Sequence, residues 1–281
     1  MPAESLHVID AHHHLWRYSE EQYPWISERM GILRRDYSIE EMKLLAYQHG
    51  IIGTIAVQAR QSLEETEWLL SLAEQNSLIR GVVGWVPLID PAIERCLEQF
   101  GGRPLLKGVR HVLHDELDDY YMMRSDFNHG IALLQEFDLI YDILIFEKHL
   151  PQTISFVDRH PNQIFVVDHI AKPRITSGEP SAWQANIEEL AKRPNVYCKL
   201  SGIVTEANWD TWSLSELQPY FDCVLDAFGP ARLMFGSDWP VVTLSSSYGR
   251  WLDVIKRVIA NLSLEEQRSI LLQTATAVYN L

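Results

Sequence analysis

The chain has 281 residues, of which 47% are hydrophobic and 22% are charged, a composition typical of a globular protein with a large core. Its formal net charge of -14 argues against nucleic acid or an anionic membrane as a partner, because both are bound mainly through clustered Lys and Arg. The 3 cysteines are far apart and include no Cys-x-x-Cys pair, so they predict neither a disulfide framework nor a zinc knuckle.

Membrane and export signals are the next features to consider. No stretch of the chain approaches the roughly 18 consecutive apolar residues that a membrane-spanning helix needs. No basic segment followed by an apolar core precedes Leu6, so the pattern of a secretory signal is not found there. We therefore expect a cytoplasmic protein with a small-molecule partner. A homo-oligomer is compatible with the sequence, which does not specify one.

Eight short apolar runs with strand character recur along the chain, separated by segments with helical spacing. They span residues 7–11, 53–58, 81–87, 108–112, 141–145, 165–169, 196–200 and 233–236. Capping signals precede three of the expected helices, at Ser38-Ile39-Glu40-Glu41, at Asp90-Pro91-Ala92 and at Ser263-Leu264-Glu265-Glu266.

Strand and helix therefore alternate eight times, within the length of about 250 residues typical of a TIM barrel. We predict an α/β fold, a (β/α)8 TIM barrel, with residues 1–281 forming one domain. A doubly wound parallel sheet is the alternative. It would need a glycine-rich phosphate-binding fingerprint after the first strand, and no such glycines follow Asp10-Ala11-His12.

The connections that follow the expected strands are long and aromatic, whereas those that follow the helices are short. The long ones are residues 16–37, 114–124, 170–183 and 204–214. In a barrel these connections gather at the carboxyl ends of the strands, which is where TIM barrels bind their substrates.

Polar side chains lie at the ends of most of the expected strands. His12 and His14 follow the first strand two residues apart, a spacing that places both rings on one face. The later strands end in Gln58 and Arg60, Trp85, Arg110 and His111, Asp168 and His169, Lys199, and Asp238. Each has a structural explanation by itself, such as a core histidine, a buried ion-pair partner or a helix N-cap. Their convergence at one end of a barrel favours a functional site.

Five motifs occur in order along nearly the whole chain: Asp-Ala-His-His-His-Leu-Trp (10–16), Gly-Val-Arg-His (108–111), Asp-His-Ile-Ala-Lys-Pro (168–173), Cys-Lys-Leu-Ser-Gly (198–202) and Met-Phe-Gly-Ser-Asp-Trp-Pro (234–240). Together they resemble the signatures of the amidohydrolase-related TIM-barrel lactonases. The pattern is most similar to the sugar-lactone hydrolases that act on L-fuconolactone or L-rhamnonolactone, and the pyrone-dicarboxylate lactonases are relatives.

The resemblance implies that the catalytic and metal-binding site consists of His12, His14, His169 and Asp238. Asp238 would act as general base toward water, while the histidines bind one divalent ion or donate hydrogen bonds to the lactone carbonyl. Zn²⁺ is the favoured ion for three imidazoles and a carboxylate. Because a lactone is an activated ester, the ion is not obligatory in the way it would be for an amide. The seventh strand offers Lys199 instead of a histidine, which argues against a two-ion centre.

The expected substrate-binding residues lie at the same end of the barrel, and the aromatic ones favour a ring-shaped substrate. They are Trp16, Gln58, Arg60, Trp85, Arg110, His111, Lys172 and Trp239. The sequence thus predicts hydrolysis of a sugar lactone to the aldonic acid. The alternatives are a pyrone-dicarboxylate lactonase or an aromatic-acid decarboxylase on the same scaffold, and a non-catalytic barrel, which would not need the four site residues together.

Overall fold

Eight parallel strands form one sheet in the order β1 to β8, as the sequence predicted. The computed structural model describes residues 6–100, 102–177 and 181–281. Its strands are β1 (Val8–His13), β2 (Ile51–Val57), β3 (Ile79–Gly84), β4 (Leu106–Val112), β5 (Ile140–Leu144), β6 (Phe165–Val167), β7 (Val196–Leu200) and β8 (Leu233–Phe235). Residues 178–180 of one expected loop lie outside the described residues.

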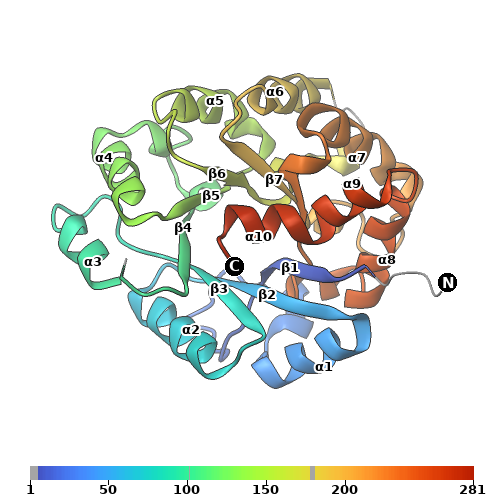
Figure 1. The fold of residues 1–281 in the computed structure, drawn as a ribbon, viewed down its shortest axis with the longest axis horizontal. Helices are drawn as coiled ribbons and strands as arrows, with labels where there is room; N and C mark the ends of the chain where they lie inside the picture. The colour runs from blue at the N-terminus through green and yellow to red at the C-terminus, as the bar shows by residue number, and fades with distance from the viewer. Residues whose placement is uncertain (1–5, 101, 178–180) are drawn as a thin grey trace.

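Helices surround this sheet and give the layered outline of a TIM barrel (Figure 1). They are α1 (Ile39–His49), α2 (Leu63–Gln75), α3 (Ile93–Phe100), α4 (Ser125–Leu134), α5 (Leu150–Asp158), α6 (Ser181–Ala191), α7 (Leu214–Phe228) and α8 (Tyr248–Val258). Among the described residues, none of the helices has both the length and the apolar character that crossing a membrane would require.

The local signals read from the sequence begin the helices where expected. Ser38 and Ser263 each form a capping box with the glutamate three residues later, at the start of α1 and of α9 (Leu264–Arg268). The carboxylate of Asp90 accepts a hydrogen bond from the backbone of Ala92, just before α3. These caps satisfy backbone N–H groups that the first turn of a helix leaves unpaired.

The barrel closes between β1 and the segment that follows β8. The backbone N–H of Asp238 donates to the carbonyl of His12 at 2.8 Å, and that of His14 donates to the carbonyl of Trp239 at 2.6 Å. Asp10 adds a side-chain clasp, because its carboxylate accepts from the backbone of Ser237 and from the hydroxyl of Tyr248 on α8. The closure therefore brings the first and the last sequence motifs into direct contact.

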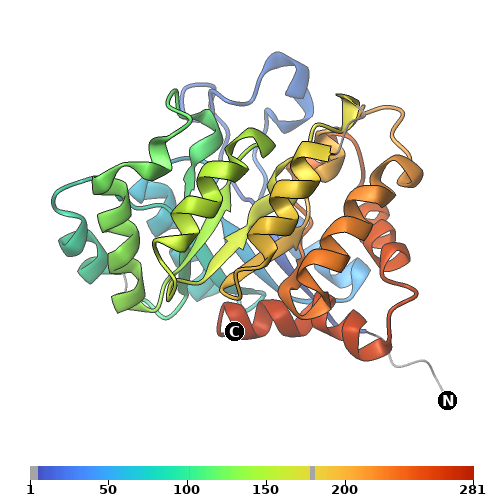
Figure 2. The ribbon, with the colours of Figure 1, turned by 90° about the horizontal axis from the view of Figure 1, so that it is seen from above.

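The C-terminal segment covers one end of the barrel. After α9, a π-helical turn (Ser269–Gln273) leads into α10 (Thr274–Val278), which crosses the centre of the ring in Figure 1. Figure 2 shows this segment at the opposite end of the molecule from the long connection after β1. The side chains of Ala275, Val278 and Tyr279 pack into the apolar cluster formed by the strand residues Ile9, Ala11, Ile55, Val57, Val83, Ile140, Val166 and Met234. The end that carries the long connections is thus left for the functional groups.

Candidate active site at the end of the barrel

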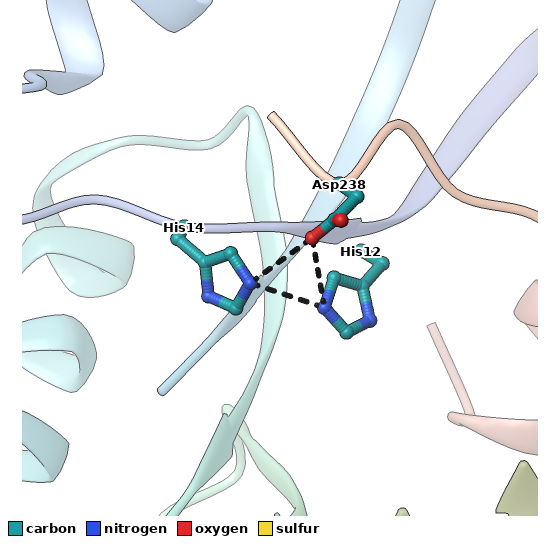
Figure 3. A group of neighbouring side chains, drawn as sticks. All are labelled: His12, His14 and Asp238. Carbon is teal, nitrogen blue, oxygen red and sulfur yellow. Dashed lines mark hydrogen bonds and ion pairs between the residues drawn. The ribbon is translucent and has the colours of Figure 1, made fainter. Parts of the chain in front are cut away.

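The four residues expected to form the site converge above the strands. The Oδ1 atom of Asp238 lies 3.4 Å from Nε2 of His14, 3.8 Å from Nε2 of His12 and 3.9 Å from Nε2 of His169. The Nε2 atoms of His12 and His14 are 3.2 Å apart, and Figure 3 shows both rings directed at the Asp238 carboxylate. One carboxylate oxygen, from the segment after β8, therefore faces three imidazole nitrogens, two from β1 and the residue that follows it and one from the turn after β6.

An irregularity in β1 directs the two histidines inward. Asp10 pairs with Thr54 and His13 with Ala56, so β1 carries one residue more than β2 over this stretch. Such a bulge changes which face a side chain points to. Asp10 thus binds Tyr248 on the helical side, while His12 faces the barrel interior. The Nδ1–H of His14 donates to the carbonyl of Val57 at 2.8 Å, which leaves its Nε2 lone pair toward the site.

His169 is placed by an unusual turn after β6. Four consecutive residues, His169 to Lys172, have φ between 46° and 61°, a conformation that costs L-residues free energy and clusters at functional sites. The sequence placed His169 in a strand, but β6 ends at Val167 and the turn begins at Asp168. His169 Nδ1 lies 2.8 Å from the hydroxyl of Ser201, so Nε2 faces Asp238. Burial holds the pKa of His169 well below its usual range, which keeps the ring neutral.

Asp238 is the single carboxylate among these four residues, and it also lies in the left-handed region, at φ 56°. Burial by itself would raise the pKa of Asp238, but the neighbouring imidazoles of His169 and His14 bring it below its ordinary value. Only 5% of its side chain is exposed. The site thus holds an ionised carboxylate in a largely water-excluded environment, where its interactions with neighbouring charges and dipoles are stronger than in bulk water.

A second layer of buried charges lies beneath the histidines. Asp168 Oδ2 binds Nη1 of Arg110 at 2.9 Å, and Asp168 Oδ1 lies 3.0 Å from Nζ of Lys199 and 3.2 Å from Nδ1 of His12. Burial opposes ionisation of Asp168, yet Lys199, His12 and Arg110 together hold its pKa well below the usual range. The carboxylate of Asp168 therefore contacts the ring nitrogen of His12 that faces away from Asp238 and helps to orient this ring.

Four of the expected substrate-binding residues, Gln58, Arg60, Arg110 and Lys172, are bonded to or paired with other groups of the protein. Gln58 donates from Nε2 to the carbonyl of Arg110, and Nη2 of Arg110 binds the carbonyl of Gln58. Lys172 pairs with Glu206 at 2.9 Å. Arg60 contacts Glu65 at 3.9 Å and lies over the ring of Tyr23.

Trp85 and His111 form a separate pair next to Arg110. The indole N–H of Trp85 donates to Nδ1 of His111, whose Nε2 lies 2.6 Å from Glu116. Burial lowers the pKa of His111. The ring of His111 also stacks on Tyr121, so this group presents a combined polar and aromatic surface.

Two tryptophans that the sequence predicts at the substrate are buried in this structure. Trp16 is fully buried, donates to the carbonyl of Arg35 and contacts Tyr37 edge to face. Trp239 is 4% exposed, and its ring also contacts Tyr37 edge to face. Both rings thus pack beside His14 and Asp238, and their contact with a substrate stays a prediction. A single sequence does not separate these roles, because large rings serve cores and ligand sites alike.

Sequence reasoning missed three polar side chains that belong to the neighbourhood. Asp142 and Tyr279 lie below Lys199, and His114 stacks on Phe146 near Lys172. A signal was present for Asp142, because it interrupts an apolar run that is otherwise buried. Tyr279 lies far from every motif, near the end of the chain, and carried no such signal.

The geometry of the four residues fits a single divalent cation. Nitrogen and oxygen atoms of His12, His14 and Asp238 all lie within 4.8 Å of one another, and so do those of His12, Asp168 and His169. Imidazole nitrogens and a carboxylate oxygen are ligands typical of Zn²⁺. Because both groups use His12, they share one ligand and favour one ion over two.

We expect elemental analysis of the untagged protein to find at most about one equivalent of Zn²⁺, and His12→Ala to remove most of it. His13→Ala is the matched control, because His13 is equally buried on the same strand but bonds Thr54 on the other face. Two tightly held equivalents, or equal losses in the two variants, would contradict this assignment.

Both the sequence and the structure of this chain are similar to those of known proteins. A model of the amidohydrolase family (Amidohydro_2) matches residues 9–281. The chain is 40% identical over 284 residues to L-fucono-1,5-lactonase of Burkholderia multivorans, which covers 97% of this chain and 96% of that protein. A crystal structure of an amidohydrolase from Burkholderia multivorans with bound zinc superposes with a TM-score of 0.94 at 40% identity, covering 98% of this chain and 99% of that one. A probable 2-pyrone-4,6-dicarboxylic acid hydrolase from Acinetobacter baumannii, 16% identical with a TM-score of 0.81, shares the fold over 98% of this chain and 99% of that one.

Proposed function

Because the chain belongs to the amidohydrolase family, as the match over residues 9–281 shows, we propose that it hydrolyses a neutral sugar lactone to the aldonic acid. L-fucono-1,5-lactone is the first substrate to test, since the relative that acts on it is 40% identical over nearly the whole chain. The observation that carries the proposal is the position of Asp238 Oδ1 against the Nε2 atoms of His12, His14 and His169.

Asp238 acts as the general base in the proposed reaction. Its Oδ1 accepts a proton from water as the water oxygen attacks the lactone carbonyl carbon. The bond from this carbon to the ring oxygen then breaks, and the proton on Asp238 passes to the leaving alkoxide, which becomes a hydroxyl of the acid product. The side chains of His14 and Asp238 are only 6% and 5% exposed, so bulk water competes little for their hydrogen bonds.

The three histidines orient the reacting groups around Asp238. Their Nδ1 atoms are engaged by Val57, Ser201, and Asp168 with Lys199, so the rings are fixed before the substrate binds. When bound by His12, His14, His169 and Asp238, a divalent ion would supply Lewis-acid polarisation of the carbonyl.

The charges around the site favour a neutral substrate over a dicarboxylate. Each arginine and lysine expected to bind the substrate already has an acidic partner: Arg110 pairs with Asp168, Lys172 with Glu206, and Arg60 with Glu65. An anionic substrate would have to break these pairs, which costs free energy when a partner is buried. Hydroxyl groups, by contrast, bind to paired side chains through their remaining donor and acceptor positions.

We therefore expect kcat/KM for L-fucono-1,5-lactone to change by less than about twofold between low and moderate salt, because screening acts on charged partners and leaves neutral ones unaffected. The measurement is a pH-indicator assay at several ionic strengths, with a pyrone dicarboxylate as the anionic comparison. Failure on every sugar lactone together with fast, salt-sensitive hydrolysis of the dicarboxylate would overturn the proposal and favour the pyrone-dicarboxylate alternative.

A further inference from the structure

Lys199 is a fully buried ammonium group that the reaction itself does not use. Its Nζ lies 2.5 Å from Asp142 Oδ2, 3.0 Å from Asp168 Oδ1 and 3.2 Å from Nδ1 of His12. All four side chains have no exposed surface. The ammonium donates a hydrogen bond to Asp142, forms an ion pair with Asp168 and contacts the ring of His12. Removing it would therefore take a cation away from two buried carboxylates, one of which also contacts His12.

The group continues from Lys199 to the C-terminal end of the chain. The hydroxyl of Tyr279 lies 3.0 Å from both oxygens of Asp142, and its ring lies under the Lys199 ammonium, 5.5 Å from Nζ. Tyr279 follows α10, which crosses the centre of the ring in Figure 1 and lies at the opposite end of the molecule from the long connection after β1 in Figure 2. Successive contacts thus link Tyr279 to Asp142, Asp142 to Lys199, and Lys199 to His12.

We propose that Lys199 is a positioning residue that holds His12 and Asp168 for the reaction while its charge limits how tightly the site binds a cation, and that Tyr279 fixes Lys199 through Asp142. The kinetic part of this inference rests on the proposed lactonase function. The cation-binding part does not, because it concerns only the charge beside His12.

The charge argument follows from the balance of the buried groups. Asp142 and Asp168 carry two negative charges, and Lys199 and Arg110 carry two positive charges, so the layer beneath the histidines is neutral as a whole. Lys199 is in direct contact with His12, which is a member of both candidate cation-binding groups. A positive charge at this distance repels a divalent ion, and its removal leaves a net negative charge.

The test replaces Lys199 by methionine, which keeps the length of the side chain and removes the charge. In Lys199→Met we expect Zn²⁺ to bind roughly tenfold more tightly, while kcat for L-fucono-1,5-lactone falls roughly tenfold and KM changes by less than about twofold. Zn²⁺ affinity is measured by competition with a chromophoric chelator on the full chain. General damage to the site would instead weaken Zn²⁺ binding and catalysis together.

The variant Lys199→Met with Asp142→Asn guards against a failure to fold, because it removes both members of the closest ion pair and leaves Asp168 paired with Arg110. A smaller rise in Zn²⁺ affinity is expected here, because the charge in contact with His12 is removed but the layer stays neutral as a whole. Unchanged or weaker Zn²⁺ binding in this folded variant would overturn the role of Lys199. Wild-type protein that hydrolyses no lactone would refute the proposed function, and the Zn²⁺ measurement would still decide the charge argument.

Tyr279→Phe tests the C-terminal part of the proposal, because it removes only the hydroxyl that binds Asp142. We expect kcat to fall roughly threefold at unchanged KM. Tyr23→Phe is the matched control, since it also removes a buried hydroxyl bound to a carboxylate, that of Glu65, without touching the Lys199 group. Equal kcat values in the wild type and Tyr279→Phe, or equal losses in both variants, would show that Tyr279 does not position the site.

Discussion

The Asp238→Asn variant should keep the fold while kcat for a sugar lactone falls by roughly two to four orders of magnitude. The amide has nearly the shape of the carboxylate, and the backbone contact from Asp238 to His12 does not depend on the side chain. What the amide cannot do is accept the proton of the attacking water. Since His169 and His12 are held neutral by burial, their rings stay in place without compensating for the lost charge.

Thermal unfolding and steady-state kinetics measured on the same preparation check this expectation. Asp210→Asn is a suitable control, because Asp210 is an exposed carboxylate in the connection before α7. Retention of most of the wild-type kcat in Asp238→Asn would remove Asp238 from the role of base, and the reaction would then have to begin at another group.

The architecture was accessible from the sequence because each of its signals is local. Alternation of apolar strands with capped helices predicted the barrel, and short connections on one side indicated which end we expect to bind substrate. The sequence predicted His12, His14, His169 and Asp238 because they occur in the motifs and also at the ends of the expected strands. The convergence of their side chains within 3.9 Å confirms that these four side chains lie together.

The remaining details depend on contacts between distant parts of the chain. The bulge in β1, which directs His12 inward, follows from pairing with β2 and leaves no pattern in residues 8–13 themselves. The left-handed turn at His169 depends on its tertiary surroundings, since no local propensity favours four such residues in a row. For the same reason Tyr279 could not be linked to Asp142, which lies 137 positions earlier in the chain.

The buried charges beneath the histidines are better explained by support of the candidate site than by stabilisation of the fold. Burying an ion pair in place of apolar side chains is often neutral or unfavourable for stability. A barrel core that contains Asp142, Asp168, Lys199 and Arg110 therefore gains little stability from them. Their arrangement makes sense when rigid support of His12 is the benefit, because preorganised groups need not reorganise during the reaction.

Gly202 should be the most sensitive glycine of the site, and Gly202→Ala is expected to reduce both stability and activity. Its φ is 62°, and a Cβ added there would lie 2.4 Å from Nδ1 of His169, the atom that contacts Ser201. The left-handed conformation alone costs an alanine about 1–2 kcal/mol. Displacement of His169 adds to this, so we expect the free energy of unfolding to fall by about 2–4 kcal/mol in total. Because a misplacement of about 1 Å can lower a reaction rate about a hundredfold, we expect kcat to fall by about 10²-fold.

Gly50→Ala separates these two contributions. Gly50 ends α1 with φ 70°, but a Cβ added at this position would meet nothing within 4 Å. Gly50→Ala should therefore lose only the stability that the left-handed backbone conformation costs an alanine, and its kcat should not change. Gly202→Ala, by contrast, should lose both stability and kcat. Urea unfolding and kinetics on both variants provide the comparison. If Gly202→Ala retained wild-type kcat, the ring of His169 could move without consequence, and the fixed orientation of this histidine would not be part of the mechanism.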